Sequence, residues 1–374
     1  LFGAVMMMIW MFRRTHVDVE EKNTNIHKFT YRRRWHLAAI LLLGWFMYGF
    51  LTLRPLNFFR AFRLNDEFKS NLALNPMQNF FTTLRFRDPD YHTEAARYYP
   101  DMQRMLNLTG SPKRGQNPYA RIGYPGSRAI ECEPNVVLVI CESFSMYKSS
   151  MSGNPLQATP YFNNMCHNGI FFNRCFTPTF GTARGVFATI TGIPDVQLGK
   201  FSTRNEAAVN QRTIINELDG YDKFYFIGGR SQFNNFRGLV QNIQGVKIYE
   251  EGSFKSPKIN VWGISDKNLF LEANEVLSKQ QKPFFAIIQT ADNHRPYNIP
   301  EEDTAEFKAP QWPTDSLLKY GFESQKEYTA FHYMDFCFRK FMEAASKQPY
   351  FNNTIFVFVG DHGVDGNALH LYPP

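Results

Sequence analysis

The sequence predicts an α/β protein in which a mostly parallel sheet, flanked by helices, follows transmembrane helices. From residue 135 onward, short apolar runs alternate with amphipathic segments, as in alternating strands and helices. An earlier run of 18 nearly uncharged residues is close to the length that a helix needs to cross a bilayer. Acidic and imidazole side chains follow directly after two of the later apolar runs. These observations predict a membrane anchor and one catalytic domain.

The transmembrane helix is predicted over residues 36–53, HLAAILLLGWFMYGFLTL. Its aromatic residues and the preceding arginines favour a true span over the alternatives, a buried core helix or a signal peptide. The apolar run over residues 1–12 is then the end of another span, so the anchor over residues 1–53 is multi-pass. Because positive residues stay in the cytoplasm, Arg32 to Arg34 place everything after Leu53 on the outer face of the cytoplasmic membrane.

Composition narrows the class of partner. The chain has 41 Lys and Arg against 34 Asp and Glu, with basic clusters beside the predicted spans. Such clusters suit lipid headgroups better than a nucleic-acid groove, so we expect no nucleic-acid partner. The five cysteines form no CxxC pair and are odd in number, which argues against a zinc knuckle and a fully paired disulfide framework.

Three parts follow one another along the chain. After the anchor, residues 54–134 are polar and include a Pro/Gly-rich stretch, which indicates a juxtamembrane helical region and a linker. The catalytic domain is predicted over residues 135–374, and we expect the chain to lack sequence at both ends. The expected strands are 135–141, 223–229, 284–290 and 354–360, and the expected helices are 159–168, 182–191, 213–218, 266–279 and 326–347.

Two of the predicted strands end in possible metal ligands. Glu142 follows the first strand, and Asp361 and His362 follow the last. Ligands of open α/β sheets bind at the carboxyl ends of strands, so both groups belong on one edge. Alone, a Glu there is often only a helix N-terminal charge, and Gly-Asp-His-Gly only a turn. Together they predict a site for a hard divalent cation, Mn²⁺ or Mg²⁺, with Zn²⁺ left open.

A nucleophile is expected in the segment TPTFGTARGVFATITG. Gly181 allows a tight turn, and Thr182 opens a helical stretch whose amides would face an incoming phosphate. A threonine hydroxyl needs activation at neutral pH, which direct coordination to the predicted cation would supply. The alternative is that Thr182 only caps the helix. The rival nucleophiles in the same region are Ser145, Thr177 and Thr179.

Two further side chains are candidates for substrate contacts. His294, in QTADNHRPY, follows the third predicted strand and could donate to a phosphate or protonate a leaving alkoxide. In GGRSQFNNFRG, Arg237 is preferred over Arg230 as a bidentate phosphate partner. The alternative is that His294 is an incidental loop histidine and that the arginine is an exposed structural residue.

Four ordered segments, NVVLVICESFS, TPTFGTARG, TADNHRPY and VFVGDHG, resemble the sulfatase-type domain of the lipoteichoic acid synthase and phosphoglycerol transferase family. The resemblance covers residues 135 to the end, and the upstream spans resemble that family's membrane anchor. It implies an alkaline-phosphatase-like fold and a covalent glycerophospho-threonine intermediate on Thr182. It also implies an Mn²⁺ site built by Glu142, Thr182, Asp361 and His362. In the same resemblance, His294 and Arg237 contact the phosphoglycerol.

The implied donor is a phosphatidylglycerol-like lipid, and the implied acceptor is a glycolipid, a growing polymer or a glucan. The position matched to Arg237 lies in a segment whose alignment can slip by one residue. The residues that normally follow His362, including a late histidine of two-metal relatives, are missing, so a second metal site is left open.

Three alternative functions remain at this point. A phosphoethanolamine transferase would share the threonine and the anchor but differ in the donor headgroup. A sulfatase would need Cys-x-Pro-x-Arg, and the nearest segment, Cys132-Glu133-Pro134, has Val136 in place of arginine. An inactive binding or sensor module is disfavoured because all four predicted metal-site residues are present.

Overall fold

The computed structural model describes residues 34–42, 97–98, 100–101, 103–104, 133–178, 180–196 and 201–364. The chain divides into two units, residues 1–85 and 86–374. In the first unit, residues 34–42 are helical, and the rest of the span predicted over 36–53 lies outside the described residues. None of the described helices is long and apolar enough to cross a bilayer. The run over residues 1–12 and nearly all of the region 54–134 also lie outside the described residues.

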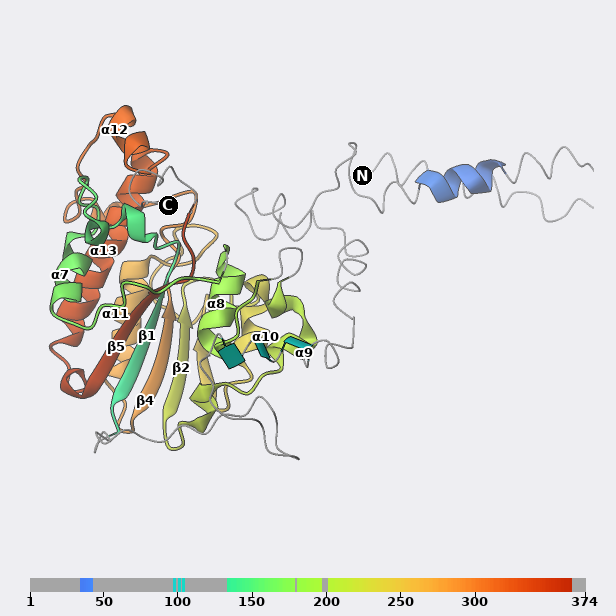
Figure 1. Ribbon diagram of the computed structural model, residues 1–374, viewed down its shortest axis with the longest axis horizontal. Coiled ribbons are helices and arrows are strands. Elements are labelled where there is room, and N and C mark those ends of the chain that lie inside the picture. Colours follow the sequence, from blue (N-terminus) through green and yellow to red (C-terminus); the bar gives the residue numbers. More distant parts are fainter. Residues whose placement is uncertain are drawn as a thin grey trace, which may run out of the picture. The chain divides into compact units, whose positions relative to one another are not determined.

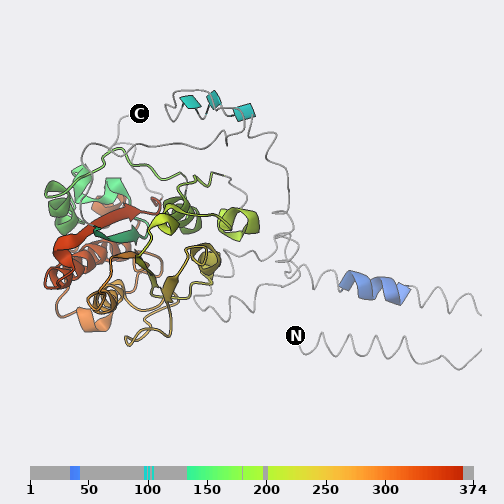
Figure 2. The same ribbon diagram turned by 90° about the horizontal axis from the view of Figure 1, so that it is seen from below.

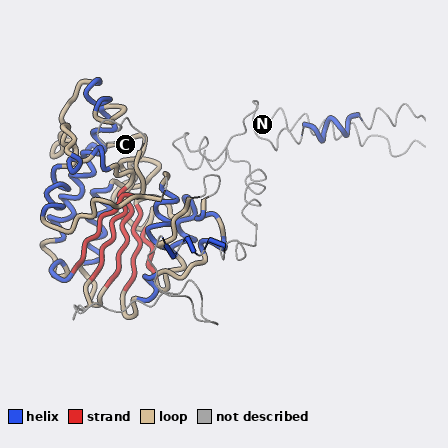
Figure 3. The backbone as a smooth tube through the Cα atoms, viewed as in Figure 1, coloured by secondary structure: helices blue, strands red, loops and turns tan. Residues whose placement is uncertain are grey.

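Five parallel strands form one sheet in the second unit, in the order β3-β2-β4-β1-β5 (Figure 3). This confirms the predicted parallel α/β architecture. All four predicted strands are present, β2 ending two residues early, and the four-residue β3 had not been predicted. The strands are β1 (Asn135–Cys141), β2 (Asp222–Ile227), β3 (Val246–Tyr249), β4 (Phe284–Gln289) and β5 (Thr354–Gly360).

Helices cover both faces of the sheet (Figures 1 and 2). Four of the five predicted helices are α-helices within two residues of their expected bounds, and the segment 213–218 forms a 3-10 helix, Ile214–Glu217. From residue 133 onward, the described α-helices are α7 (Pro160–His167), α8 (Thr182–Thr191), α9 (Glu206–Val209), α10 (Phe236–Val240), α11 (Asp266–Leu277), α12 (Thr314–Lys319) and α13 (Gln325–Ala345).

Alternation along the strands divides the core into two layers. In β1, Val137 and Val139 are fully buried in the cluster that includes residues of α11 and α13, whereas Ile140 belongs to the cluster that includes residues of α8 and α10. This is the period of two expected for a sheet covered on both faces. Two long helices begin at serine caps, since the Ser265 and Ser324 side chains accept backbone N–H groups at the starts of α11 and α13.

The strand order decides where the chemistry lies. β1 is the central neighbour of β4 and β5, and all three run in the same direction. The residues that follow these strands, beginning at Glu142, Thr290 and Asp361, therefore leave the sheet at one edge.

Candidate metal centre

Glu142 and Asp361 are placed side by side by strand register. Cys141 of β1 pairs with Gly360 of β5, and the Asp361 amide donates to the Cys141 carbonyl at 3.2 Å. The Glu142 amide donates to Thr290 Oγ1 at 2.9 Å, which ties the end of β1 to the end of β4. Both carboxylate residues are buried, Glu142 being 4% exposed and Asp361 1% exposed. Neighbouring strand ends thus hold two carboxylates away from bulk solvent.

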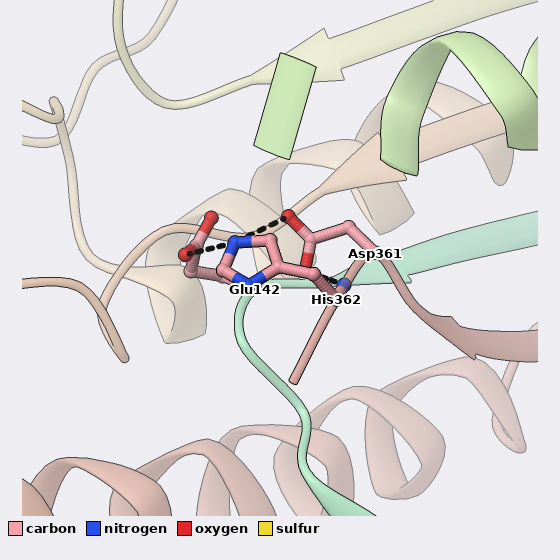
Figure 4. Close-up of side chains that lie close together, drawn as sticks. All are labelled: Glu142, Asp361 and His362. Atoms are coloured by element: carbon pink, nitrogen blue, oxygen red, sulfur yellow. Dashed lines mark hydrogen bonds and ion pairs between the residues drawn. The ribbon is translucent and has the colours of Figure 1, made fainter. Parts of the chain in front are cut away.

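His362 completes this cluster, as Figure 4 shows. Its Nε2 lies 3.7 Å from Glu142 Oε1 and 3.6 Å from Asp361 Oδ2. Its Nδ1 lies 2.7 Å from the carbonyl oxygen of Gly363. Because a carbonyl can only accept, Nδ1 carries a proton in this contact, which leaves Nε2 as the nitrogen that faces the carboxylates. One ligand atom from each of the three residues lies within 4.8 Å of the others.

Thr182 reaches the same cluster from the opposite side. It is the first residue of α8, as predicted, and follows Gly181, whose φ of 93° favours glycine. Its Oγ1 donates to Glu142 Oε2 at 3.2 Å and lies 3.3 Å from His362 Nε2. A Cβ added to Gly185 would lie 2.0 Å from the Asp361 carbonyl oxygen, so the backbone of α8 packs directly against the end of β5.

The donor set fits a hard divalent cation. Asp361 Oδ1 accepts the amides of Ser143 and His362 at 2.8 and 2.7 Å, but its Oδ2 is buried without a hydrogen-bond partner in the described part of the chain. An unpaired buried carboxylate oxygen is costly unless a cation or proton compensates it. Two carboxylates, one imidazole and one hydroxyl suit Mn²⁺ or Mg²⁺, and also Zn²⁺, with Glu142, Thr182, Asp361 and His362 as the residues that would hold the ion.

Crowding of these groups changes their proton affinities. Burial, together with the charge of Glu142, raises the pKa of Asp361 to about 7. Burial lowers the pKa of His362, but the charges of Asp361 and Glu142 outweigh it, so the pKa of His362 is raised. The cluster without a cation therefore favours protonated forms near neutral pH, and a bound cation must displace those protons.

Proton competition predicts that the affinity for Mn²⁺ decreases as the pH falls. Since the pKa of Asp361 is about 7, binding below this pH must release at least one proton, and the affinity should fall about tenfold per pH unit. Above about pH 8 the affinity should level off. Titration calorimetry at several pH values, in buffers of different ionisation enthalpy, measures both quantities. Affinity that is constant between pH 6 and pH 8, with no proton release, would contradict the prediction.

His294 lies on the loop after β4, at the same edge of the sheet as predicted. It is half-buried, its ring packs at a tilt against the Trp262 indole, and the preceding Asn293 donates its side-chain amide to the Glu142 carbonyl at 3.0 Å. In the described part of the chain, no hydrogen bond or ion pair joins the His294 side chain directly to Glu142, Thr182, Asp361 or His362. Its substrate role remains a prediction.

Arg237 lies in α10 and is engaged by a carboxylate. Its guanidinium forms an ion pair with Glu250, which also accepts the amide and hydroxyl of Ser231. Burial raises the pKa of Glu250, but these hydrogen bonds and the Arg237 charge outweigh it and lower the pKa. Arg230 forms a more exposed pair with Glu251. A phosphate role for Arg237 remains a prediction, in which one guanidinium would serve both a carboxylate and a phosphate.

The rival nucleophiles differ clearly in their surroundings. Ser145 is buried, and its hydroxyl accepts the Val364 amide at 2.7 Å. Thr177 is exposed on the segment before α8, and Thr179 lies outside the described residues. Among the described candidates, only Thr182 has a hydroxyl within hydrogen-bonding distance of two of the predicted metal ligands.

Supporting residues around the cluster were missed by the sequence reasoning. Ser143 donates its amide to Asp361 and its hydroxyl to Glu142 Oε1 at 2.7 Å, with a positive φ of 54°. Thr290 and Asn293 hold the backbone of Glu142 from the β4 side. Ser143 could have been suspected from its place beside Glu142, whereas Thr290 and Asn293 become relevant only once β4 is known to neighbour β1.

The fold and the cluster together define the class of protein. The family model described as Sulfatase matches residues 134–373, more than half of the chain. The chain belongs to the sulfatase family, as the sequence motifs predicted. A solved structure of a protein in the alkaline phosphatase superfamily from Vibrio parahaemolyticus aligns with a TM-score of 0.58 at 24% identity, covering 74% of this chain and 66% of that one. The likeness confirms the alkaline-phosphatase-like fold.

More particular relatives are lipoteichoic acid synthases. Lipoteichoic acid synthase 1 of Bacillus subtilis is 23% identical over 352 residues, covering 90% of this chain and 52% of the relative. The Staphylococcus aureus lipoteichoic acid synthase is 22% identical over 281 residues, or 71% of this chain and 41% of the relative. The crystal structure of a lipoteichoic acid synthase from Listeria monocytogenes shares the fold, with a TM-score of 0.53, 20% identity and coverage of 62% and 57%. The chain spans about half the length, or less, of these curated relatives.

Proposed function

We propose that this chain carries the membrane anchor and the catalytic-domain residues of a metal-dependent transferase that moves a phosphoglycerol-type group from a phospholipid to a glycan or polymer acceptor. One observation carries the proposal. The Thr182 hydroxyl lies at the N-terminus of α8 and within 3.3 Å of atoms of both Glu142 and His362. A hydroxyl at a helix N-terminus beside a cluster of cation ligands suits attack on a phosphodiester. The similarity to lipoteichoic acid synthases supports the same class of reaction.

The reaction would proceed through a covalent intermediate on Thr182. The hydroxyl gives up its proton, Oγ1 forms a bond to phosphorus, and the bond from phosphorus to the diacylglycerol oxygen breaks. That oxygen takes up a proton, for which His294 is the candidate donor. An acceptor hydroxyl then attacks the same phosphorus and passes its proton to His294, while the bond from phosphorus to Thr182 Oγ1 breaks and Oγ1 regains a proton. A cation held by the cluster would favour the alkoxide form of Thr182 and offset the charge of the phosphate.

The proposed arrangement along the chain follows the expected partners. A membrane anchor over residues 1–53, a helical juxtamembrane region and linker over 54–134, and a catalytic domain from residue 135 would hold the site outside the cytoplasmic membrane. A lipid donor would explain the tether, because the reacting phosphate stays at the bilayer surface. We assign the cation as Mn²⁺, with Mg²⁺ and Zn²⁺ as alternatives for the same donor set.

The donor headgroup separates this function from that of a phosphoethanolamine transferase. Incubation of the full-length protein and Mn²⁺ with labelled phosphatidylglycerol should release diacylglycerol, and labelled phosphatidylethanolamine should release much less. The Thr182→Ala protein serves as the blank for both lipids. Release from phosphatidylethanolamine alone would replace the phosphoglycerol proposal with the second candidate, and hydrolysis of a sulfate ester would indicate a sulfatase instead.

A further inference from the structure

The loop that carries His294 is fixed on both sides of the histidine. Before it, the buried carboxylate of Asp266, the first residue of α11, accepts the amides of residues 291 and 292 at 2.8 and 3.0 Å. The Asn293 side chain donates to the Glu142 carbonyl at 3.0 Å. The backbone next to His294 is therefore tied both to α11 and to the strand end that carries a predicted metal ligand.

Trp262 makes the contact to the imidazole itself. The two ring centroids lie 4.1 Å apart, with an angle of 53° between the planes. The indole Nε1 donates to the Arg295 carbonyl at 2.8 Å, and the same carbonyl lies 2.9 Å from Nδ1 of His294. Because the carbonyl can only accept, Nδ1 must carry the proton in this contact, and Nε2 is the nitrogen that retains a lone pair.

The indole is itself held from the β2 side. A Cβ added to Gly229, just after β2, would lie 2.6 Å from the Trp262 carbonyl oxygen, so the two backbones are in close contact. Phe233 packs edge-on against the indole, with ring centroids 5.1 Å apart. Trp262 thus transmits a position fixed by the β2 loop to a histidine on the β4 loop.

We propose that Trp262 is a positioning residue that acts through His294, holding the imidazole in one orientation and one tautomer. The torsion that turns an imidazole is broad, so a half-buried loop histidine without such a support would populate several orientations. The contact between the two rings limits this rotation, and the shared Arg295 carbonyl selects protonation at Nδ1. The inference rests on the proposed function, in which His294 contacts the transferred phosphate or protonates the leaving oxygen.

The kinetic test compares Trp262→Ala, Trp262→Phe and the matched control Trp312→Phe, which alters a half-buried tryptophan that packs edge-on against Tyr328. Misplacement of a reacting group should lower kcat/KM of Trp262→Ala by about 10- to 100-fold. Trp262→Phe keeps a ring but loses the indole N–H, so its loss should be smaller. In a His294→Ala background, Trp262→Ala should lower kcat/KM further by less than about twofold, because the two residues act as one unit. Fully additive losses would overturn the proposal.

A second measurement needs no substrate. Nitrogen-15 spectra of the histidine side chains should show His294 protonated at Nδ1 in the unaltered protein and in Trp312→Phe, and a mixture of tautomers in Trp262→Ala. An unchanged His294 spectrum in Trp262→Ala would refute the positioning role. This outcome is independent of the transferase proposal, which fails separately if Thr182→Ala retains phospholipid turnover.

Discussion

Replacing Thr182 with alanine should abolish transfer while leaving the fold and the metal affinity largely intact. The hydroxyl supplies the atom that attacks phosphorus, whereas the carboxylates and imidazole of the cluster come from other elements. Loss of a nucleophile typically lowers kcat by on the order of 10⁴-fold or more. Diacylglycerol release from labelled phosphatidylglycerol measures the rate, and titration calorimetry with Mn²⁺ measures the retained affinity.

Thr177→Ala is the matched control, because Thr177 is exposed on the segment before α8 and forms no hydrogen bond with the cluster in the described part of the chain. Its turnover should equal that of the unaltered protein. Mass spectrometry after rapid quenching should find a glycerophosphate adduct on the peptide that contains Thr182. An adduct on Ser145 or Thr179, with Thr182→Ala still active, would assign the nucleophile elsewhere.

Asp361→Asn should have the largest effect on metal binding. The substitution retains an oxygen that can accept the Ser143 and His362 amides, but it removes the charge of the oxygen that has no hydrogen-bond partner in the described part of the chain. Loss of a residue that only supports a ligand costs about 10- to 100-fold in metal affinity, so loss of a ligand itself should cost at least about 100-fold. Calorimetry with Mn²⁺, Mg²⁺ and Zn²⁺ measures the loss, and the preferred ion identifies the cofactor.

Without added cation, the same variant should be at least as stable as the unaltered protein at pH 8. Burial and Glu142 raise the pKa of Asp361 to about 7, so its stabilising contribution is present below the unfolded pKa and lost as the pH rises through about 7. Asparagine has no such dependence. Asp335→Asn is the control for metal affinity only, since Asp335 is a buried carboxylate with a raised pKa that accepts the amides of Tyr161 and Phe162 instead. Equal Mn²⁺ affinity of Asp361→Asn and unaltered protein would exclude Asp361 as a ligand.

Local patterns were sufficient to predict much of the fold. The runs that form β1 and β5 are seven residues long and uninterrupted by charge, and their observed bounds equal the predicted ones. β3 was missed because it is four residues long and contains Lys247, too short and too polar for a clear signal. The strand predicted over 223–229 ends at Ile227, since Gly228 and Gly229 leave the sheet to pack against the backbone of residues 262–264.

The candidate site was predictable where strand ends determined it, and less so where distant loops meet. Glu142, Asp361 and His362 follow strands directly, and the rule that ligands gather at carboxyl ends of parallel strands predicted their cluster. The pairing of Arg237 with Glu250 depends on how β3 ends beside α10, and no local pattern encodes it. The ring contact between Trp262 and His294 also joins residues 32 positions apart in the sequence, so no local pattern predicts it.

The close packing of Gly185 against the Asp361 carbonyl has a mechanical consequence. Because no side chain separates α8 from the end of β5, the helix that carries Thr182 and the strand end that carries Asp361 and His362 should move as one rigid body. The spacing between hydroxyl and ligands is then insensitive to motions elsewhere. Any opening that admits a bulky lipid must therefore come from segments other than this helix and strand.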